Sequence, residues 1–224
     1  AAKAGGMEVG AAAAAAMLCL VALAGGGAHA QRALSQYVRD EWTGDRGFPG
    51  GTVYGVTQSS DGYLWIGAEK GLVRFDGLRF QLLPSTGAPN TAPAVLGVAP
   101  APDGSIYVIH RCFANSCAGR KEAPILKYDP SGKLLKTWGE EMFIFPHGAT
   151  VDRDGNLWVT DARGDGPKGH QVFKFSSDGK VLMTLGKAGV SGSGRDLFDQ
   201  PTDVVIAPNG DIFVTDSHRT GGLN

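Results

Sequence analysis

Residues 147–161 read HGATVDRDGNLWVTD, and residues 202–216 read TDVVIAPNGDIFVTD. Each stretch consists of a short apolar segment, a polar turn containing Asp-Gly or Asn-Gly, and a second apolar segment. Two earlier stretches follow the same plan, TVYGVTQSSDGYLWIGA at 52–68 and AVLGVAPAPDGSIYVIH at 94–110. Asp-Gly and Asn-Gly supply the positive φ angles that a tight hairpin requires. The chain therefore contains four copies of one predicted hairpin.

A second predicted hairpin follows each of the first three copies. These hairpins are GLVRFDGLRFQLL at 71–83, ILKYDPSGKLLKTWG at 125–139 and QVFKFSSDGKVLMTLG at 171–186. Four strands per unit, repeated every ~40–55 residues, are typical of β-propeller blades. The second strand of each unit is apolar on both faces, as expected of a blade packed between two neighbours. We predict an all-β fold, an incomplete propeller of about 3.5 four-stranded blades.

The last unit ends at Asn224 with its outer strands missing. An open ring of blades leaves strand edges and one blade face uncovered. We therefore expect the chain to be truncated at its C-terminus and the missing blades to come from the remainder of a longer chain. The alternative is that a second chain supplies them.

Composition excludes several classes of protein. Of the 224 residues 34 are Gly, about twice the usual ~7% share, which disfavours long helices. The formal net charge of −1 argues against nucleic-acid binding and against a polybasic membrane-surface protein.

The N-terminal segment has the features of a leader. Residues 11–24 form the apolar run AAAAAAMLCLVALA, and Ala28 and Ala30 are small residues at the positions that a signal peptidase reads. The run is short for a membrane span, which needs ~20 residues. We predict a signal peptide over 1–30, cleavage after Ala30, no membrane span after cleavage, and a secreted or periplasmic protein. An uncleaved anchor is the alternative.

Two cysteines remain after removal of the leader, Cys112 and Cys117 in CFANSC. Export implies an oxidising compartment, so we favour a disulfide that closes this loop. Two free thiols are the alternative. A metal site is disfavoured because no second cysteine or histidine pair accompanies them.

Two known propeller families share motifs with this chain. Residues 42–83, with SSDGYLWIGAEKGLVRFDG at 59–77, resemble the two-component-regulator propeller repeat of sensor domains. Residues 95–224, with FPHGATVDRDGNLWVTD at 145–161, resemble NHL-repeat proteins and, among these, the peptidyl-α-hydroxyglycine α-amidating lyases. Accordingly, we expect a regulator-type blade over 31–93 and NHL-type blades over 94–224, joined at a seam over 81–93 that is natural or a misassembly.

The lyase resemblance implies a six-bladed propeller that releases glyoxylate from a peptidyl-α-hydroxyglycine. It also implies a zinc ion held by three histidines and a structural calcium held mainly by backbone carbonyls. His147 matches the first zinc ligand, and the other two would lie beyond Asn224. Arg111 matches a substrate-binding arginine, and Val98 and Ala149 match positions whose carbonyls face the calcium.

The residues themselves support part of this assignment. Val98, Ala149 and Val204 occupy equivalent positions of the repeat, and oxygen ligands suit Ca²⁺. His147 stands where other copies have Tyr, Leu or Thr, which makes it a candidate ligand, although a catalytic zinc needs about three protein ligands. A channel-lining role for His147 and a salt-bridge role for Arg111 are the alternatives.

The chain departs from the lyases at the catalytic base. The tyrosine that the lyases carry in a DGY motif is replaced here, where the run is Asp216-Ser217-His218. We consider His218 as the base, because its pKa suits neutral pH, or as a surface residue. His110 and His170 are expected to have structural roles.

Two functions follow as hypotheses. The first is an exported, zinc-dependent, peptidylamidoglycolate lyase-like enzyme, of which residues 31–224 alone are expected to be inactive. The second is a non-catalytic sensory propeller that binds a peptide or small molecule at its axis. Propellers host many functions, so the fold does not decide between them.

Overall fold

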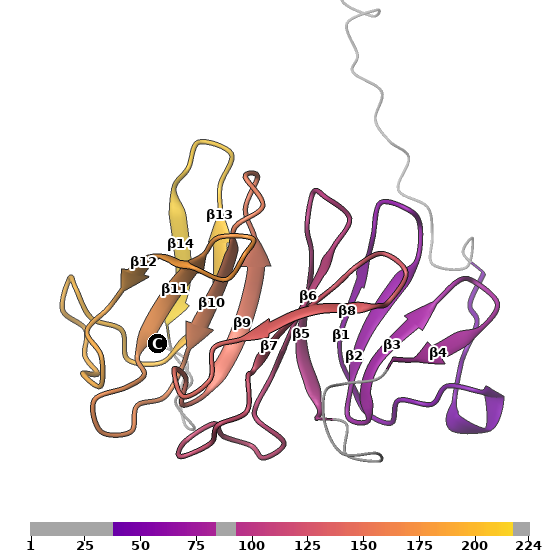
Figure 1. The fold of residues 1–224 in the computed structure, drawn as a ribbon, viewed down its shortest axis with the longest axis horizontal. Coiled ribbons are helices and arrows are strands. Elements are labelled where there is room, and N and C mark those ends of the chain that lie inside the picture. The colour runs from indigo at the N-terminus through magenta and orange to yellow at the C-terminus, as the bar shows by residue number, and fades with distance from the viewer. Residues whose placement is uncertain (1–37, 84–92, 217–224) are drawn as a thin grey trace, which may run out of the picture. The chain divides into compact units, whose positions relative to one another are not determined.

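The computed structural model describes residues 38–83 and 93–216. Residues 38–41 are exposed, and the described residues from Trp42 onward belong to one compact unit. Within the described ranges the chain has fourteen strands and one short 3₁₀ helix, η2 (Gly44–Arg46) (Figure 1). No helix in these ranges has the length and apolar character to cross a membrane. The predicted signal peptide and its cleavage site lie outside the described residues.

The strands form three four-stranded antiparallel sheets and one hairpin, which we call blades 1 to 4. Blade 1 contains β1 (Val53–Gln58), β2 (Leu64–Ala68), β3 (Gly71–Phe75) and β4 (Phe80–Leu82). Blade 2 contains β5 (Val95–Pro100), β6 (Ile106–His110), β7 (Ile125–Tyr128) and β8 (Leu134–Trp138). Blade 3 contains β9 (Pro146–Val151), β10 (Leu157–Asp161), β11 (Gln171–Phe175) and β12 (Val181–Leu185). Blade 4 is the hairpin of β13 (Pro201–Ile206) and β14 (Ile212–Asp216).

Each blade has the strand order of its sequence, and the first strands of successive blades are neighbours. β1 lies beside β5, β5 beside β9, and β9 beside β13. Neighbouring first strands with meandering sheets behind them are the arrangement of a propeller, in which these strands are the inner ones. The predicted all-β propeller with three complete blades and half of a fourth is therefore confirmed.

The hairpin turns differ in one detail from the prediction. At the first turn the N–H of Gly62 donates to the carbonyl of Ser59, and the N–H of Ser59 donates to the carbonyl of Tyr63. Gly62 has a φ of 91°, whereas Asp61 is not among the residues with positive φ. This is a three-residue loop with a single left-handed residue rather than a turn with two. Gly62 alone supplies the positive φ at this turn.

The core lies between successive blades. All residues of β6 and β10 are buried, as are four of the five residues of β2. Tyr107 and Ile109 of blade 2 belong to one apolar cluster with Leu157 and Val159 of blade 3. This confirms the expectation of strands that are covered on both faces. In β14, by contrast, Ile212 and Phe213 are exposed in the described structure.

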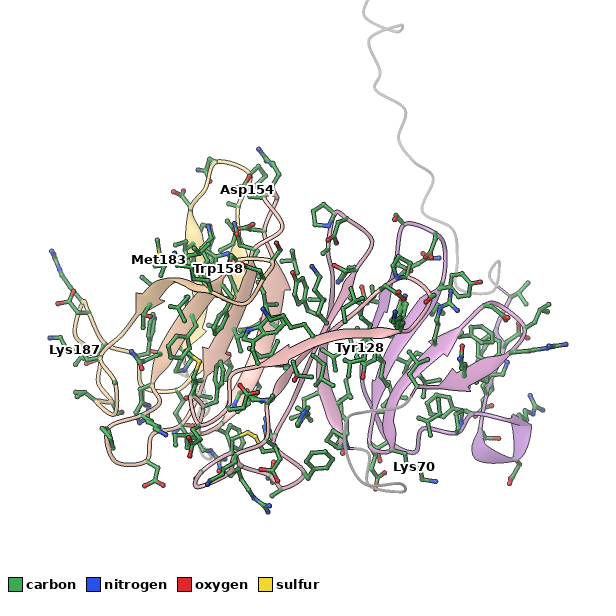
Figure 2. All side chains as sticks on the ribbon, viewed as in Figure 1. Lys70, Tyr128, Asp154, Trp158, Met183 and Lys187 are labelled. Carbon is green, nitrogen blue, oxygen red and sulfur yellow. A yellow bond between two sulfur atoms is a disulfide. The ribbon has the colours of Figure 1, made fainter. Side chains whose placement is uncertain are left out.

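A pair of an aromatic and a cationic side chain recurs in the three complete blades. Trp65 faces Arg74 across β2 and β3, Tyr107 faces Lys127 across β6 and β7, and Trp158 faces Lys174 across β10 and β11. The cation lies 5.6, 5.1 and 5.1 Å from the ring centre in the three pairs. Figure 2 shows Trp158 among the densely packed side chains of blade 3. A cation over an aromatic face adds to the stability of the blade.

Candidate functional site

Equivalent residues of the inner strands define the start of the site. The second residues of β1, β5, β9 and β13 are, in order, Tyr54, Leu96, His147 and Thr202. Each lies within the register shift in the pairing of its strand with the next. His147 is therefore the only histidine among these four equivalent residues of the described inner strands.

His147 is half-buried and its orientation is fixed by the neighbouring blade. Its Nδ1 lies 2.9 Å from the carbonyl oxygen of Thr202. A carbonyl only accepts, so Nδ1 carries the proton, and in the neutral ring the lone pair is on Nε2. Histidines that bind metal through Nε2 are commonly held in this way by a second bond at Nδ1.

A close approach of β13 to β9 makes this bond possible. A Cβ atom added to Gly148 would lie 2.5 Å from the carbonyl oxygen of Thr202. The same carbonyl accepts a hydrogen bond from the Thr160 hydroxyl at 3.2 Å, and that hydroxyl accepts from the Gly148 N–H at 2.9 Å. The absence of a side chain at Gly148 thus lets two blades meet directly beside His147.

Arg111 follows β6 directly and is held from three sides. Its Nε donates to the carbonyl of Pro146 at 3.2 Å, and its Nη1 donates to Oδ1 of Asn115 at 2.7 Å. The guanidinium carbon lies 3.6 Å from the centre of the Phe145 ring. Burial, and next the charge of Arg163, lower the pKa of Arg111 to about 10, so it remains cationic at neutral pH.

Arg111 lines a cleft of about 510 Å³. The other lining residues come from blades 1 and 2 and their connecting segments: Tyr54, Glu69, Pro93, Ala94, Leu96, Phe113, Ala114 and Asn115. Phe145, on which Arg111 lies, is also near His147, because the rings of Phe145 and His147 have their centres 6.2 Å apart. Arg111 and His147 therefore both lie beside Phe145.

A disulfide closes the loop that carries Arg111 and Asn115. Cys112 and Cys117 are bonded, as predicted, and both are buried. Cys112 and Phe113 have φ angles of 49° and 59°, in the left-handed region that non-glycine residues seldom adopt. A covalent closure holds this unfavourable backbone in place.

His110 anchors the same loop. Its Nδ1 accepts a hydrogen bond from the Cys112 N–H at 3.0 Å. Burial lowers the pKa of His110 to about 4, so the ring is neutral and able to accept. The expected structural role of His110 is confirmed by this bond. His170, which precedes β11, donates from Nδ1 to the carbonyl of Asp199 at 2.5 Å, which is also a structural bond.

The metal predictions concern residues that the structure describes only in part. Among residues 38–83 and 93–216 there is no group of three His, Cys, Asp or Glu side chains placed to bind a metal. Val98 and Ala149 occupy the same position of neighbouring inner strands, paired with Val108 and Val159. Their role in binding calcium stays a prediction. His218 lies outside the described residues, so its role also stays a prediction.

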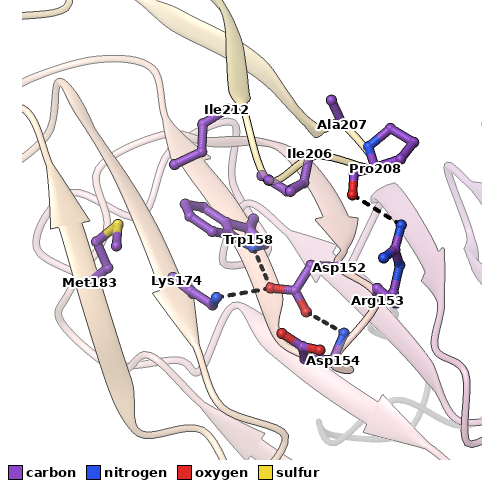
Figure 3. Close-up of a pocket in the computed structure, with 11 residues that line it drawn as sticks. Asp152, Arg153, Asp154, Trp158, Lys174, Met183, Ile206, Ala207, Pro208 and Ile212 are labelled. Carbon is purple, nitrogen blue, oxygen red and sulfur yellow. Dashed lines mark hydrogen bonds and ion pairs between the residues drawn. The ribbon is translucent and has the colours of Figure 1, made fainter.

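A second cleft, of about 360 Å³, lies between blade 3 and blade 4 (Figure 3). Its walls include Trp158, Met183 and Ile212, and its polar centre is Asp152. The carboxylate of Asp152 accepts from Nε1 of Trp158 at 3.0 Å and pairs with Lys174 at 3.0 Å. Because these polar groups already satisfy one another, this cleft offers less to a ligand than the cleft beside Arg111.

Two side chains of the site were not predicted from the sequence, Phe145 and Arg163. Phe145 is part of the FPHG motif but carries no chemistry of its own in the sequence, and Arg163 lies in the loop after β10 without a motif. The position of Arg163 in the repeat could have indicated it: Arg163 follows the end of β10 by two residues, much as Arg111 follows the end of β6 by one. Charged residues that follow equivalent strand ends gather at one end of the blades.

Family comparisons support the predicted resemblance. The model of the NHL repeat matches residues 198–219, and that of the two component regulator propeller matches residues 47–70. The chain is 45% identical over 102 residues to peptidyl-alpha-hydroxyglycine alpha-amidating lyase 1 of Drosophila melanogaster, which is 44% of this chain and 18% of that protein. Lyase 2 of the same organism is 32% identical over 141 residues, 55% of this chain and 34% of that protein. The chain thus spans about a third or less of these relatives.

Solved structures confirm the fold. A streptogramin B lyase superposes with a TM-score of 0.52 at 18% identity, covering 75% of this chain and 49% of that one. The extracellular domain of a one component system of B. thetaiotaomicron, described as putative, gives 0.52 at 14% identity, covering 76% of this chain and 21% of that one. This NHL-type chain is accordingly a propeller with relatives among α-amidating lyases, and it resembles a regulator propeller in its first blade.

Proposed function

We propose that the full-length protein is an exported NHL-type propeller with peptidylamidoglycolate lyase-like activity. In this reaction the carbon–nitrogen bond of a peptidyl-α-hydroxyglycine breaks, giving glyoxylate and a peptide amide. The observation that carries the proposal is that Phe145 lies beside both Arg111 and His147, in a chain 45% identical over 102 residues to a lyase of this kind.

Arg111 would bind the carboxylate of the substrate. A guanidinium offers five N–H donors in a plane, which suits a carboxylate. The bonds of Arg111 to Pro146 and Asn115 fix its plane before the substrate arrives. A fixed donor loses less side-chain entropy on binding, which favours affinity.

His147 would supply one ligand of the zinc ion. The bond from Nδ1 to the Thr202 carbonyl fits this role, since it leaves the lone pair of the neutral ring on Nε2. The described residues supply this ligand and no complete set, so the other ligands would have to come from the rest of the full-length protein. A bound zinc ion would acidify the substrate hydroxyl as a Lewis acid. His218 would take the hydroxyl proton as general base.

Calcium would have a structural role in the same proposal. Val98 and Ala149 would contribute backbone carbonyl oxygens from neighbouring inner strands, which are the hard ligands that Ca²⁺ takes. Metal analysis of the purified full-length protein, before and after chelation, measures both ions directly. Zinc that disappears with His147→Ala while calcium stays is the expected result.

The direct test is glyoxylate release from a peptidyl-α-hydroxyglycine by the full-length protein. We expect His147→Ala or a chelator to abolish turnover, and Arg111→Ala to raise KM at least about tenfold, because a charge-assisted hydrogen bond is worth ~1.5–3 kcal/mol. His170→Asn is the matched control, since it changes a histidine of the same blade at a left-handed position that Asn tolerates. Unchanged turnover in His147→Ala would contradict the metal assignment.

A sensory propeller is the second candidate. The match of the two component regulator propeller to residues 47–70 favours it. Under this function the cleft beside Arg111 would bind a peptide or small molecule without turnover. Binding of such a ligand by a protein that holds zinc but releases no glyoxylate would favour the sensor over the lyase.

A further inference from the structure

Two guanidinium groups share the ring of Phe145. The guanidinium carbon of Arg111 lies 3.6 Å from the ring centre, and that of Arg163 lies 4.0 Å from it. Phe145 itself is 2% exposed, and its N–H donates to the buried carboxylate of Asp161 at 2.5 Å. The ring is therefore a fixed platform that holds two positive charges close together.

No acidic side chain of the described residues neutralises this pair. The ion pairs in these ranges join Arg120 to Glu122, Lys127 to Asp103 and Lys174 to Asp152. Glu69 lines the same cleft as Arg111, but its Oε2 accepts from the N–H and the hydroxyl of Thr52. Burial lowers the pKa of Arg111, and the neighbouring positive charge of Arg163 lowers it further, because like charges disfavour each other.

The two arginines keep donors for a ligand. Stacking on an aromatic ring uses the flat face of a guanidinium and leaves its N–H groups at the edge. Arg111 uses Nε and Nη1 for its bonds to Pro146 and Asn115 and keeps the donors of Nη2. Arg163 is exposed, and none of the hydrogen bonds described above uses its guanidinium. An anion that binds here would meet oriented donors from both side chains.

We propose that Arg163 is a specificity-determining residue of this site, which, with Arg111, selects ligands carrying two neighbouring carboxylates. This inference rests on the proposed function, in which Arg111 binds the terminal carboxylate of a peptide. Arg163 lies further toward solvent, so it takes the carboxylate of an acidic side chain next to that terminus. The substrate class is therefore a peptide with Asp or Glu immediately before its C-terminal glycine unit.

The test measures binding, so it does not depend on turnover. Calorimetry of the full-length protein uses acetyl-Ala-Asp-Gly and acetyl-Ala-Asn-Gly, both with a free carboxylate. We expect the Asp peptide to bind about fivefold tighter, as an exposed charge pair allows. Arg163→Ala should bring the ratio of the two dissociation constants close to one, and Arg163→Lys should restore part of it.

Arg195→Ala is the matched control, because Arg195 is an exposed arginine of the loop after blade 3, whereas the guanidinium groups over Phe145 are those of Arg111 and Arg163. It should keep the preference for the Asp peptide. Equal affinity of the wild type for both peptides, or an unchanged preference in Arg163→Ala, overturns the proposal. A preference that depends on Arg163 in a protein that releases no glyoxylate supports the anion site and contradicts the lyase function, so the two proposals fail separately.

Discussion

The second strands of blades 3 and 4 have nearly the same sequence and very different surroundings. β10 reads LWVTD and is buried throughout, whereas β14 reads IFVTD and has four of its five residues exposed. Both end in an aspartate that accepts two backbone N–H groups: Asp161 those of Ile144 and Phe145, and Asp216 those of Asp199 and Gln200. The repeat sequence therefore determines the hairpin and its closing bonds, while the neighbouring blades determine burial.

The largest expected difference between the two strands comes from replacing the aromatic residue of each, because one is buried by neighbouring blades and the other is exposed. Trp158 is 2% exposed, so Trp158→Ala should lower the free energy of unfolding by about 3–5 kcal/mol. Phe213 is 61% exposed, so Phe213→Ala in this chain should cost less than about 1 kcal/mol. Urea denaturation of both variants measures the difference. Equal losses would mean that another surface covers β14 in solution.

The buried aspartate should make stability depend on pH. Burial raises the pKa of Asp161 to about 6, although its amide bonds act in the opposite direction. The folded state then holds this proton more tightly than the unfolded state, so the contribution is present below pH ~4 and is lost as pH rises to ~6. The expected loss for a shift of this size is about 3 kcal/mol.

Asp161→Asn, which keeps an acceptor for the amide groups, should remove this dependence between pH 4 and 6. Asp152 acts in a separate window: burial raises its pKa, but the bonds from Trp158, Asn156 and Lys174 prevail and lower it to about 2. Its contribution is present above pH ~4 and is lost as pH falls toward 2. Unfolding free energies measured at intervals from pH 2 to 7 distinguish the two; the same slope in Asp161→Asn and wild type would contradict the assignment.

A smaller effect on stability is expected from removing the disulfide in the loop after β6 of blade 2. The double substitution Cys112→Ser and Cys117→Ser should lower the free energy of unfolding by about 2 kcal/mol, because closure of a short loop restricts the unfolded chain modestly. A reductant should destabilise the wild type by the same amount and leave the variant unchanged. A reductant effect on the variant would point to another thiol.

The smallest expected effect concerns the aromatic and cationic pair of blade 3, which blade 4 lacks within the described residues. Lys174→Met removes the ion pair with Asp152 but leaves the bonds of Asp152 to Trp158 and Asn156. We expect a loss of about 1 kcal/mol, since the pair is partly exposed. Lys180→Met, at an exposed position of the same blade, is the control. If Lys174→Met lowers the free energy of unfolding by more than Trp158→Ala does, the ion pair contributes more to the stability of the blade than the packing of the Trp158 ring.

The sequence was sufficient for features that repeat. The hairpins, the blade order and the equivalence of His147 with Tyr54, Leu96 and Thr202 follow from residue types at regular positions, whereas the disulfide was inferred from two cysteines in an exported chain. The exposure of β14 could not be read from its own residues, because IFVTD resembles a covered strand and burial depends on other blades. The position of Arg163 over Phe145 likewise depends on the path of a loop, which the repeat does not define.

Gly148 has a consequence that reaches beyond its own strand. Its bare α-carbon permits the contact through which blade 4 orients the His147 imidazole. Any side chain at position 148 would push β9 and β13 apart and reorient the His147 ring, although every polar group would remain. The orientation of His147, the proposed zinc ligand, thus depends on the contact between blades 3 and 4, and under that proposal mutations that loosen this contact should act like mutations of His147.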